Sequence, residues 1–267
     1  MKLRIYQVDA FAERPFEGNP AAVVPLEAWL ADEVMQAIAL ENNLTETAFF
    51  MPEGAGFALR WFTPTVEVPL CGHATLASAH VIFSHLSWSH DQIVFQTKSG
   101  PLSVLRAAND LLEMDFPARS GVEAIPSADL TLALGAAPET FIDGELPLAV
   151  FASPEQIADL SPDLRKLAAF SAARGDGGIC CTAPAGGVNG WDFVSRFFAP
   201  AHGIDEDPVT GGAHCALTPY WSKRLGRSRL VGRQISARGG TVLCEARGER
   251  VGLSGRCADY MIGEITI

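Results

Sequence analysis

The segments 67–74 (EVPLCGHA) and 206–213 (EDPVTGGA) share one order of features. In each, a strand-like run with an acidic residue passes through a short turn with glycine into an apolar helix. Glycine lets the backbone approach a ligand closely, and the first turn of a helix leaves N–H groups unpaired at the positive end of its dipole. The repeat predicts two similar halves, each built on a helix that begins at such a turn.

The helix expected after the first segment, over residues 74–86, is apolar on nearly every side. Such a helix is typical of the centre of a core. Strand-like alternation and one amphipathic helical pattern surround it. The expected elements are strands at 3–11, 21–24, 57–62 and three more within 92–115, and an amphipathic helix at 27–41.

A stretch rich in Pro, Ala, Ser and Gly, 116–128, is the candidate linker to the second half. There a helix at 162–173 precedes the second glycine turn, and the helix after that turn contains Pro219, which we expect to kink or shorten it. We predict an α+β fold of two similar halves, each a mostly antiparallel sheet around a central helix. The predicted domains are 1–118 and 119–267, with a last strand that can pair with the first half.

With 267 residues, the chain is long enough for two domains. Hydrophobic residues make up 48% and charged residues 19%, and the mean hydropathy is +0.16, values typical of a folded chain. The 20 basic and 31 acidic residues give a net charge of −11, which repels nucleic-acid phosphates and anionic membrane surfaces. No apolar run is long enough to span a bilayer and no signal-peptide core is present, so we expect a cytoplasmic protein without nucleic-acid or membrane partners.

The six cysteines include no CxxC pair and the six histidines no HExxH motif, so neither a disulfide framework nor a metal site is expected. Cys71 precedes a glycine at the start of the first apolar helix, where a thiolate is stabilised. It is therefore either a thiol nucleophile or a small buried residue.

Glu46 places a carboxylate next to the apolar run 48–50 (AFF). Burial of a carboxylate raises its pKa toward neutrality, which suits a general acid and base, whereas a solvated glutamate at a strand end has no such role. His73 is either a group that polarises a substrate or relays a proton, or a satisfied histidine at the helix start. Asp207 either belongs to the site or caps the turn that follows it.

The two glycine turns also suggest how an anion would be bound. If the two halves pack face to face, both helix N-termini point toward one anion. A net-acidic protein would then bind a carboxylate without an arginine. The alternative is that both segments are only tight strand-to-helix turns.

Five blocks of the sequence are specific enough to compare with known families. They are 16–23 (FEGNPAAV), 43–47 (NLTET), 70–75 (LCGHAT), 195–200 (SRFFAP) and 206–211 (EDPVTG). Together and in this order they resemble the PhzF-like phenazine-biosynthesis family, over essentially the whole chain. The resemblance implies the diaminopimelate-epimerase-like fold, with an active site in the cleft between two similar halves.

The resemblance also implies a cofactor-independent isomerase of a small carboxylate-bearing metabolite. Glu46 matches the residue that takes a proton from the substrate and returns it at another carbon, and His73 and Asp207 match the supporting pair. Family members further imply a homodimer. The substrate contacts implied by the matched motifs are Asn19, Gly72, Thr210, Gly211 and Gly212.

Gly212 departs from the phenazine enzyme, which is expected to have serine at the matching position. The change removes a hydroxyl that can contact substrate, and it favours an alternative: a metabolite-binding protein that kept the cleft and lost the chemistry. A cysteine-dependent racemase or epimerase is the other alternative. Such enzymes use two cysteines, one from each half, and Cys71 matches the first. The place of the second falls in the region of Asp207 and Pro208, which has no thiol, so this alternative is disfavoured.

Overall fold

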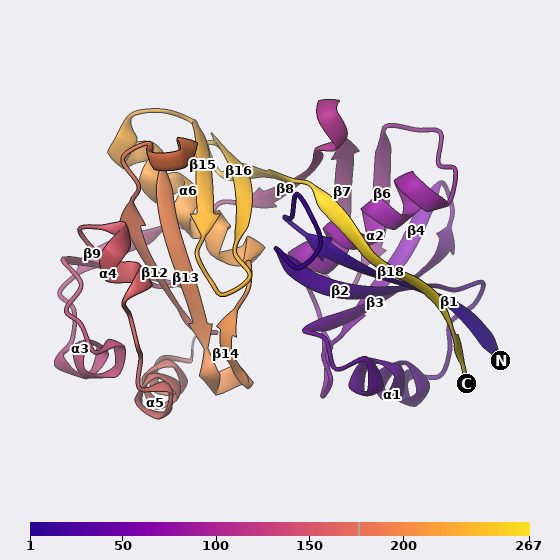
Figure 1. The fold of residues 1–267 in the computed structure, drawn as a ribbon, viewed down its shortest axis with the longest axis horizontal. Helices are drawn as coiled ribbons and strands as arrows, with labels where there is room; N and C mark the ends of the chain where they lie inside the picture. Colours follow the sequence, from indigo (N-terminus) through magenta and orange to yellow (C-terminus); the bar gives the residue numbers. More distant parts are fainter. Residues whose placement is uncertain (176) are drawn as a thin grey trace. The chain divides into compact units, whose positions relative to one another are not determined.

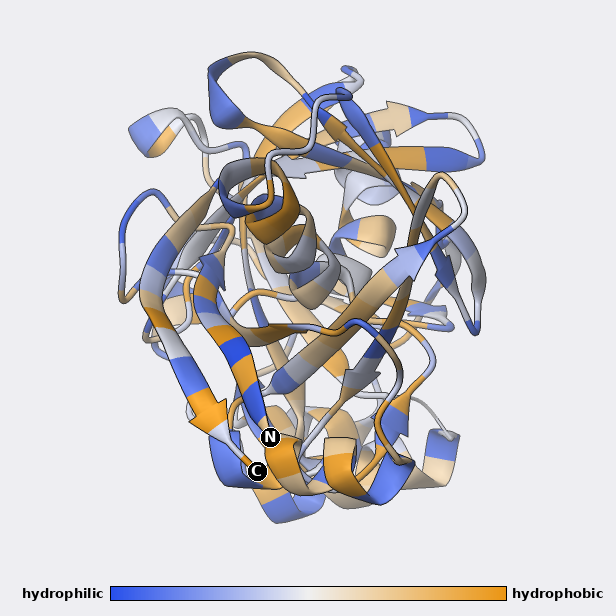
Figure 2. Cartoon of the chain, turned by 90° about the vertical axis from the view of Figure 1, so that its right-hand side faces the viewer, coloured by the Kyte–Doolittle hydropathy of each residue, from blue (hydrophilic) through white to orange (hydrophobic). Residues whose placement is uncertain are grey.

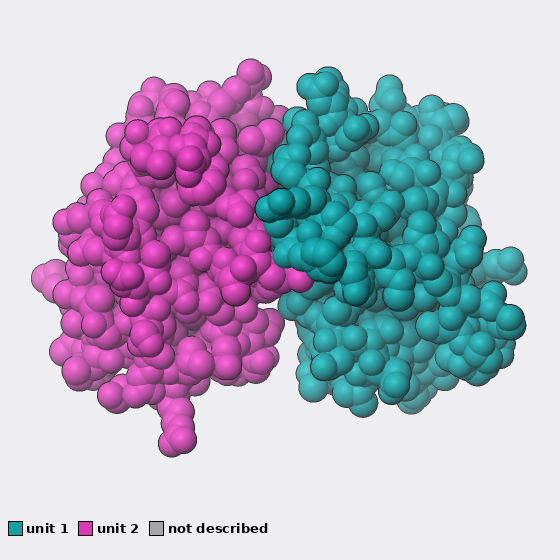
Figure 3. Space-filling model, in the orientation of Figure 1, with its two compact units in different colours: residues 1–115, 254–267 teal, residues 116–253 magenta. Residues whose placement is uncertain are grey.

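The computed structural model describes residues 1–175 and 177–267 of the chain. These residues form two compact units, drawn in different colours in Figure 3. Unit 1 contains residues 1–115 and 254–267, and unit 2 contains residues 116–253. The last segment of the chain therefore belongs to the same unit as the first.

Unit 1 contains strands and two α-helices, labelled in Figure 1. The last two residues of β8 extend into unit 2. The elements are β1 (Lys2–Ala10), β2 (Asn19–Pro25), α1 (Asp32–Asn42), β3 (Glu46–Glu53), β4 (Gly56–Phe62), β5 (Glu67–Val68), α2 (Gly72–His85), β6 (Gln92–Thr97), β7 (Gly100–Arg106), the 3-10 helix η1 (Ala108–Asp110), β8 (Leu112–Pro117) and β18 (Cys257–Thr266).

Most neighbouring strands of unit 1 run antiparallel. β1 pairs with β2 on one side and with β18 on the other, from Lys2 opposite Thr266 to Ala10 opposite Cys257. The pairs β2–β3 and β4–β6 are parallel, because a connection through α1 and one through α2 return the chain in the same direction. Figure 2 shows the alternation of hydrophobic and hydrophilic residues along β1, the pattern that predicted this strand from the sequence.

The helix α2 is the central helix of unit 1. Nine of its 14 residues are buried, and it packs against β1, β2 and β3. The prediction of a helix surrounded by strands is confirmed. The other helix, α1, packs Met35 and Ile38 into a separate cluster with Val24 and Phe49. No helix among residues 1–175 and 177–267 is both long and apolar enough to cross a membrane.

Unit 2 is also a sheet with helices, and the structure describes all of its residues except residue 176. Its elements are β9 (Gly121–Ala124), α3 (Ala128–Leu134), β10 (Thr140–Gly144), β11 (Leu148–Val150), α4 (Pro154–Ala158), α5 (Leu164–Arg174), β12 (Ile179–Pro184), the 3-10 helix η2 (Val188–Gly190), β13 (Phe193–Ala199), the 3-10 helix η3 (Pro200–His202), β14 (Ile204–Asp207), α6 (Gly211–Leu225), β15 (Arg229–Gln234), β16 (Gly240–Arg247) and β17 (Arg250–Gly255).

The sheet of unit 2 runs from β9 through β10, β11, β12 and β13 to β15 and β16, with β14 also paired to β13. Only β11–β12 and β13–β15 are parallel among these pairs. The stretch 116–128, expected to be a linker, contains β9, because Gly121 to Ala124 pair with β10. Pro and Gly content alone did not reveal that this segment has a partner strand.

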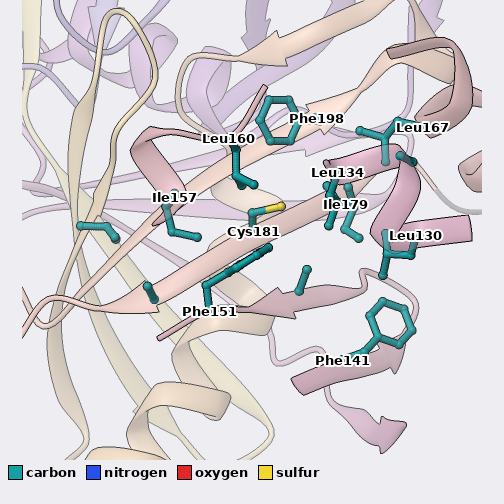
Figure 4. Close-up of a cluster of buried hydrophobic side chains, with 14 of the residues drawn as sticks. Leu130, Leu134, Phe141, Phe151, Ile157, Leu160, Leu167, Ile179, Cys181 and Phe198 are labelled. Atoms are coloured by element: carbon teal, nitrogen blue, oxygen red, sulfur yellow. The ribbon is translucent and has the colours of Figure 1, made fainter. Parts of the chain in front are cut away.

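Two helical layers complete unit 2. The helices α3, α4 and α5 bury a cluster of apolar side chains against β11, β12 and β13, drawn in Figure 4. Its members include Leu130, Leu134, Phe151, Ile157, Leu167, Ile179 and Phe198. The second glycine-headed helix, α6, packs on β15 and β16, and its Trp221 donates an indole N–H to Thr182 Oγ1 at 3.0 Å.

Pro219 does not shorten α6, which continues from Gly211 to Leu225. A proline cannot donate the helical hydrogen bond to the carbonyl four residues earlier, here that of Cys215. That carbonyl instead accepts the backbone N–H of Arg119 at 2.9 Å. Of the two expected effects of Pro219, a kink or a shorter helix, the shorter helix is wrong, since a neighbouring segment supplies the missing donor.

His214 lies on α6 and is fully buried. Its Nδ1 donates to the carbonyl of Thr210 at 2.8 Å, and its ring packs against that of Phe193. Burial lowers the pKa of His214 to about 4, so the imidazole is neutral in the folded protein at neutral pH.

The buried His214 should make unit 2 acid-sensitive. Its folded pKa of about 4 lies below the ordinary 6.5, so between these values only the unfolded chain takes up the proton. Above pH 6.5 His214 does not reduce the free energy of unfolding. As the pH falls toward 4, the free energy of unfolding decreases, by about 2 kcal/mol at pH 5. In urea unfolding, His214→Gln should lose about 2 kcal/mol less unfolding free energy than wild type when the pH is lowered from 7.5 to 5.

The exposed His202 provides the matched control. His202→Gln should keep the wild-type pH dependence, because this side chain is in solvent in the folded protein as well. If His214→Gln and wild type lose the same unfolding free energy on acidification, His214 is not the acid-sensitive group.

Candidate active site

Glu46 is the first residue of β3. The helix before it, α1, ends at Asn42 and is capped by Asn43, whose left-handed backbone (φ 48°, ψ 35°) turns the chain back toward the sheet. β3 then runs parallel to β2, with Glu46 opposite Ala21. This turn places a carboxylate at the beginning of an otherwise buried strand.

His73 and Cys71 lie at the start of α2. Cys71 is the N-cap residue, with an extended backbone, and His73 lies in the first turn. The backbone N–H and the hydroxyl of Thr75 both donate to the Cys71 carbonyl, at 3.2 and 2.5 Å. These bonds hold the first turn of the helix and with it the orientation of both side chains.

The three side chains meet inside unit 1. Nε2 of His73 lies 3.1 Å from Oε2 of Glu46, and Nδ1 of His73 lies 3.5 Å from Sγ of Cys71. Exposed fractions are 9% for Glu46, 6% for His73 and 7% for Cys71. Glu46 Oε2 and His73 Nε2 are in contact, yet neither atom has a hydrogen-bond partner of good geometry among the described residues. Each buried polar atom of this kind calls for an explanation, and here two of them face each other as a carboxylate and an imidazole.

Burial acts differently on the two ionisable groups at the helix start. It raises the pKa of the Cys71 thiol, and the nearby charge of Glu46 raises it further. Burial by itself lowers the pKa of His73, but the neighbouring Cys71 and Glu46 outweigh it and hold this pKa well above the ordinary value. The direction of the Cys71 shift disfavours an activated thiolate, and the Glu46 carboxylate favours the protonated form of His73.

Asn19 and Gly72 belong to the same neighbourhood. Asn19 begins β2, is fully buried, and its Oδ1 accepts a hydrogen bond from Thr45 Oγ1 at 3.3 Å, next to Glu46. Gly72 is the first residue of α2 and lies between Cys71 and His73. The structure thus gathers the unit 1 residues expected from the sequence around one helix start.

In unit 2 the structure places Asp207, Thr210, Gly211 and Gly212 at the start of α6. Asp207 is the last residue of β14 and is buried, and its Oδ2 accepts the hydroxyl of Thr210, the N-cap residue. Gly211 begins the helix. A Cβ at Gly212 would meet no heavy atom of the described residues within 4 Å, so a serine fits there sterically.

Gln234, the last residue of β15, is a polar anchor that the sequence analysis missed. It is fully buried, and its amide donates to the Asp207 carbonyl at 2.6 Å and to Thr210 Oγ1 at 3.2 Å. Its Oε1 accepts the Thr210 N–H at 2.9 Å. A lone glutamine in a strand gives no signal of this role, because its partners lie 24 and 27 residues away.

Glu46, Cys71 and His73 each offer one ligand atom, and these atoms lie within 4.8 Å of one another. A carboxylate, a thiol and an imidazole form a donor set that Zn²⁺ accepts. The expected absence of a metal stays a prediction at this site.

Comparison with known proteins agrees with this architecture. The family described as phenazine biosynthesis-like protein matches residues 8–263. An uncharacterized isomerase of Pseudomonas aeruginosa is 48% identical over 265 residues, 99% of each chain. A PhzF-family phenazine biosynthesis protein from Enterococcus faecalis has a crystal structure that matches with a TM-score of 0.95 at 42% identity, over 100% of both chains.

A more distant structure extends the fold comparison. A hydroxyproline epimerase from Agrobacterium vitis has a TM-score of 0.66 at 11% identity, over 99% of this chain and 92% of its own, which shows a shared fold. The α+β fold is therefore that of the epimerase-like proteins. The chain belongs to the phenazine biosynthesis-like (PhzC/PhzF) family, whose relatives include named isomerases.

Replacing Gln234 by leucine should destabilise the protein. The volume is similar, but the Thr210 N–H and the Asp207 carbonyl lose their buried partner, which costs about 2 to 4 kcal/mol of unfolding free energy. Urea denaturation measures the loss. The same change at the exposed Gln92 should stay within about 0.5 kcal/mol. Equal unfolding free energies of the two variants would show that the hydrogen bonds of Gln234 do not stabilise the folded protein.

Proposed function

We propose that the chain is a cofactor-independent isomerase that moves a proton between two carbons of a small carboxylate-bearing metabolite, with Glu46 as general acid and base. One observation carries the proposal. Glu46 Oε2 and His73 Nε2 lie 3.1 Å apart, both buried and both without a hydrogen-bond partner among the described residues.

A buried carboxylate oxygen without a hydrogen bond destabilises the folded protein. A group with that cost is expected where a substrate supplies the missing contact. Glu46 fits this description, because it lies at the buried end of β3, whereas Glu53 lies at the exposed end of the same strand. A solvated glutamate at a strand end, the alternative drawn from the sequence, does not describe Glu46 with an exposed fraction of 9%.

The proposed reaction has two proton transfers through one residue. The Glu46 carboxylate first takes a proton from an acidified carbon of the substrate: the C–H bond breaks, its electron pair stays on the substrate, and an O–H bond forms. Glu46 then gives this proton to another carbon of the same molecule. Atoms and electrons balance without an oxidant or reductant, as isomerisation requires.

His73 and Cys71 have supporting roles in this proposal. The protonated His73 places a positive charge beside the carboxylate and can stabilise negative charge on the substrate after the first transfer. Cys71 is a neutral thiol that contacts the other ring nitrogen of His73 and so positions the imidazole. Proton transfer then depends on a carboxylate and not on a thiolate.

Asp207, Thr210, Gly211 and Gly212 are proposed to serve the same reaction, with Asn19 and Gly72 as further substrate contacts. The support in unit 2 is the fixed geometry of Asp207, which Thr210 and Gln234 hold at the start of α6. The N–H groups of a helix start favour an anionic group such as a carboxylate.

A metabolite-binding protein without catalysis is the competing proposal, and Gly212 favours it. Gly212 lacks the hydroxyl that the family resemblance associates with substrate. The buried Glu46, whose Oε2 lacks a hydrogen bond of good geometry, favours catalysis, because a binder gains nothing from burying a carboxylate in this way. Binding of a ligand without any exchange of its carbon-bound protons would identify a binding protein.

Glu46→Gln should abolish proton transfer. We expect a fall of about 100-fold or more in isomerisation and in deuterium incorporation from D₂O, the usual contribution of a positioned general acid and base. NMR in D₂O with a panel of small carboxylates, including a dihydro-hydroxyanthranilate and several amino acids, measures both. Glu53→Gln, at the exposed end of the same strand, is the matched control and should keep wild-type rates.

The same experiment separates the two proposals. Deuterium that enters a carbon position only when Glu46 is intact supports the isomerase. Full turnover by Glu46→Gln would refute the role of Glu46, and binding without deuterium incorporation across the panel would favour the binding protein.

Cys71→Ala should keep catalysis within about 10-fold of wild type, because the thiol is neutral and acts only through His73. Serine at this position should come closer to wild type, since its hydroxyl can also contact Nδ1 of His73. The readout is kcat and KM on the substrate found in D₂O. A loss of 1,000-fold or more in both variants would instead indicate a thiol-dependent racemase or epimerase.

A further inference from the structure

A second cluster of ligand-type side chains lies in unit 1, at the opposite end of α2 from His73. His80 and His85 come from α2, and Asp259 comes from β18. Nε2 of His80 lies 3.1 Å from Asp259 Oδ1, and Nε2 of His85 lies 3.2 and 3.0 Å from the two carboxylate oxygens. One ligand atom from each residue lies within 4.8 Å of the other two. Two imidazoles thus converge on one carboxylate.

The backbone positions Asp259 for this contact. Where β1 pairs with β18, Gln7 lies opposite Met261 and Val8 lies opposite Asp259. Tyr260 is therefore an extra residue in β18, a β-bulge. Bulges redirect neighbouring side chains and are frequent beside functional sites. The bulge therefore lies directly next to the carboxylate that both histidines contact.

The histidines are also held in place. The ring of Tyr6 stacks on His85 with 5.1 Å between ring centroids and 28° between planes. The rings of His80 and His85 lie 6.0 Å apart, nearly perpendicular.

The cluster is open to solvent on one side. Side-chain exposure is 18% for His80, 22% for His85 and 38% for Asp259. His80 also lines a cavity of about 510 Å³, together with Glu13 and Asp110. Water can therefore reach the cluster and complete a coordination shell.

We propose that His80, His85 and Asp259 form a binding site for a divalent transition-metal ion, with Zn²⁺ as the best match, that joins the end of α2 to β18. Two imidazole nitrogens, one carboxylate oxygen and a water form a tetrahedral Zn²⁺ site. Metal–ligand bonds of about 2.0–2.2 Å place tetrahedral ligand atoms about 3.3 Å apart. The 3.0–3.2 Å separations from Asp259 are within a few tenths of an ångström of that value.

This site is independent of the proposed isomerase chemistry. The sequence analysis missed it because His80 and His85 are five residues apart and Asp259 is 174 residues from the nearer one, which matches no metal motif. The competing explanation is that Asp259 only accepts hydrogen bonds from the two imidazoles. Metal binding and its loss in variants distinguish the two.

The test is a Zn²⁺ titration of the full chain, first stripped with a chelator, against a competing chromogenic chelator. Wild type should bind one Zn²⁺ at this site. His80→Ala and His85→Ala should each weaken that binding by about 100-fold or more, beyond the 10- to 100-fold typical of changes in residues that only hydrogen-bond to a ligand. Co²⁺ should give the visible absorption of a tetrahedral site in wild type and not in His80→Ala or His85→Ala. Thermal unfolding of the metal-free variants checks that they fold.

Two control variants make the assignment specific. His90→Ala removes an exposed histidine outside the cluster and should bind Zn²⁺ as wild type does. Cys71→Ala removes a ligand of the other possible metal cluster, that of Glu46, Cys71 and His73. The proposal is overturned if wild type binds no Zn²⁺, or if binding disappears in Cys71→Ala while His80→Ala and His85→Ala keep it.

Wild-type thermal stability gives a second readout. A metal that binds only the folded protein raises its Tm, by about 5 °C or more at 100 times the Kd for a chain of this size. His90→Ala should show the same rise and His85→Ala none. A Zn²⁺-dependent rise of equal size in His85→Ala would also overturn the proposal.

Discussion

The helix α2 is apolar on almost every side, and unit 1 is arranged around the need to enclose it. Strands β1, β2 and β3 pack against it, so its first turn lies inside the unit and buries His73 and Cys71. β3 begins beside that turn and brings the Glu46 carboxylate to the imidazole. The ionisable pair is therefore buried as a consequence of packing an apolar helix, and the chemistry proposed for the site depends on that burial.

The helix α6 also has a mostly buried first half, and the turn before it is held by hydrogen bonds from side chains and backbone. Gln234 bonds the backbone on both sides of the turn before the helix, and Arg119 supplies the hydrogen bond that Pro219 removes. His214 is neutral and donates to Thr210. The two strand-turn-helix segments thus differ in geometry: the first places His73 against the Glu46 carboxylate, and the second holds the carboxylate of Asp207 through Thr210 and Gln234.

Burial has opposite consequences for the acids and bases in unit 1. An isolated thiol loses its charged form when it is buried, which leaves Cys71 neutral, whereas an imidazole beside a carboxylate keeps its proton. A neutral thiol and an imidazole beside a carboxylate agree with the proposed proton transfer by that carboxylate. Cysteine at a helix start by itself suggests a nucleophile, but burial raises the pKa of Cys71, and the proposed reaction gives it a positioning role.

The sequence alone determined the α+β class, the two buried helices and the residues at their first turns, because all-round apolar helices and glycine turns are local patterns. It also singled out Glu46 and His73 through local motifs and family resemblance. Tertiary structure decided what local patterns do not contain: that 116–128 includes a strand, that Gln234 holds the Asp207 turn, and that His80, His85 and Asp259 converge. Each depends on partners distant in the chain, and only folding brings such groups within bonding distance.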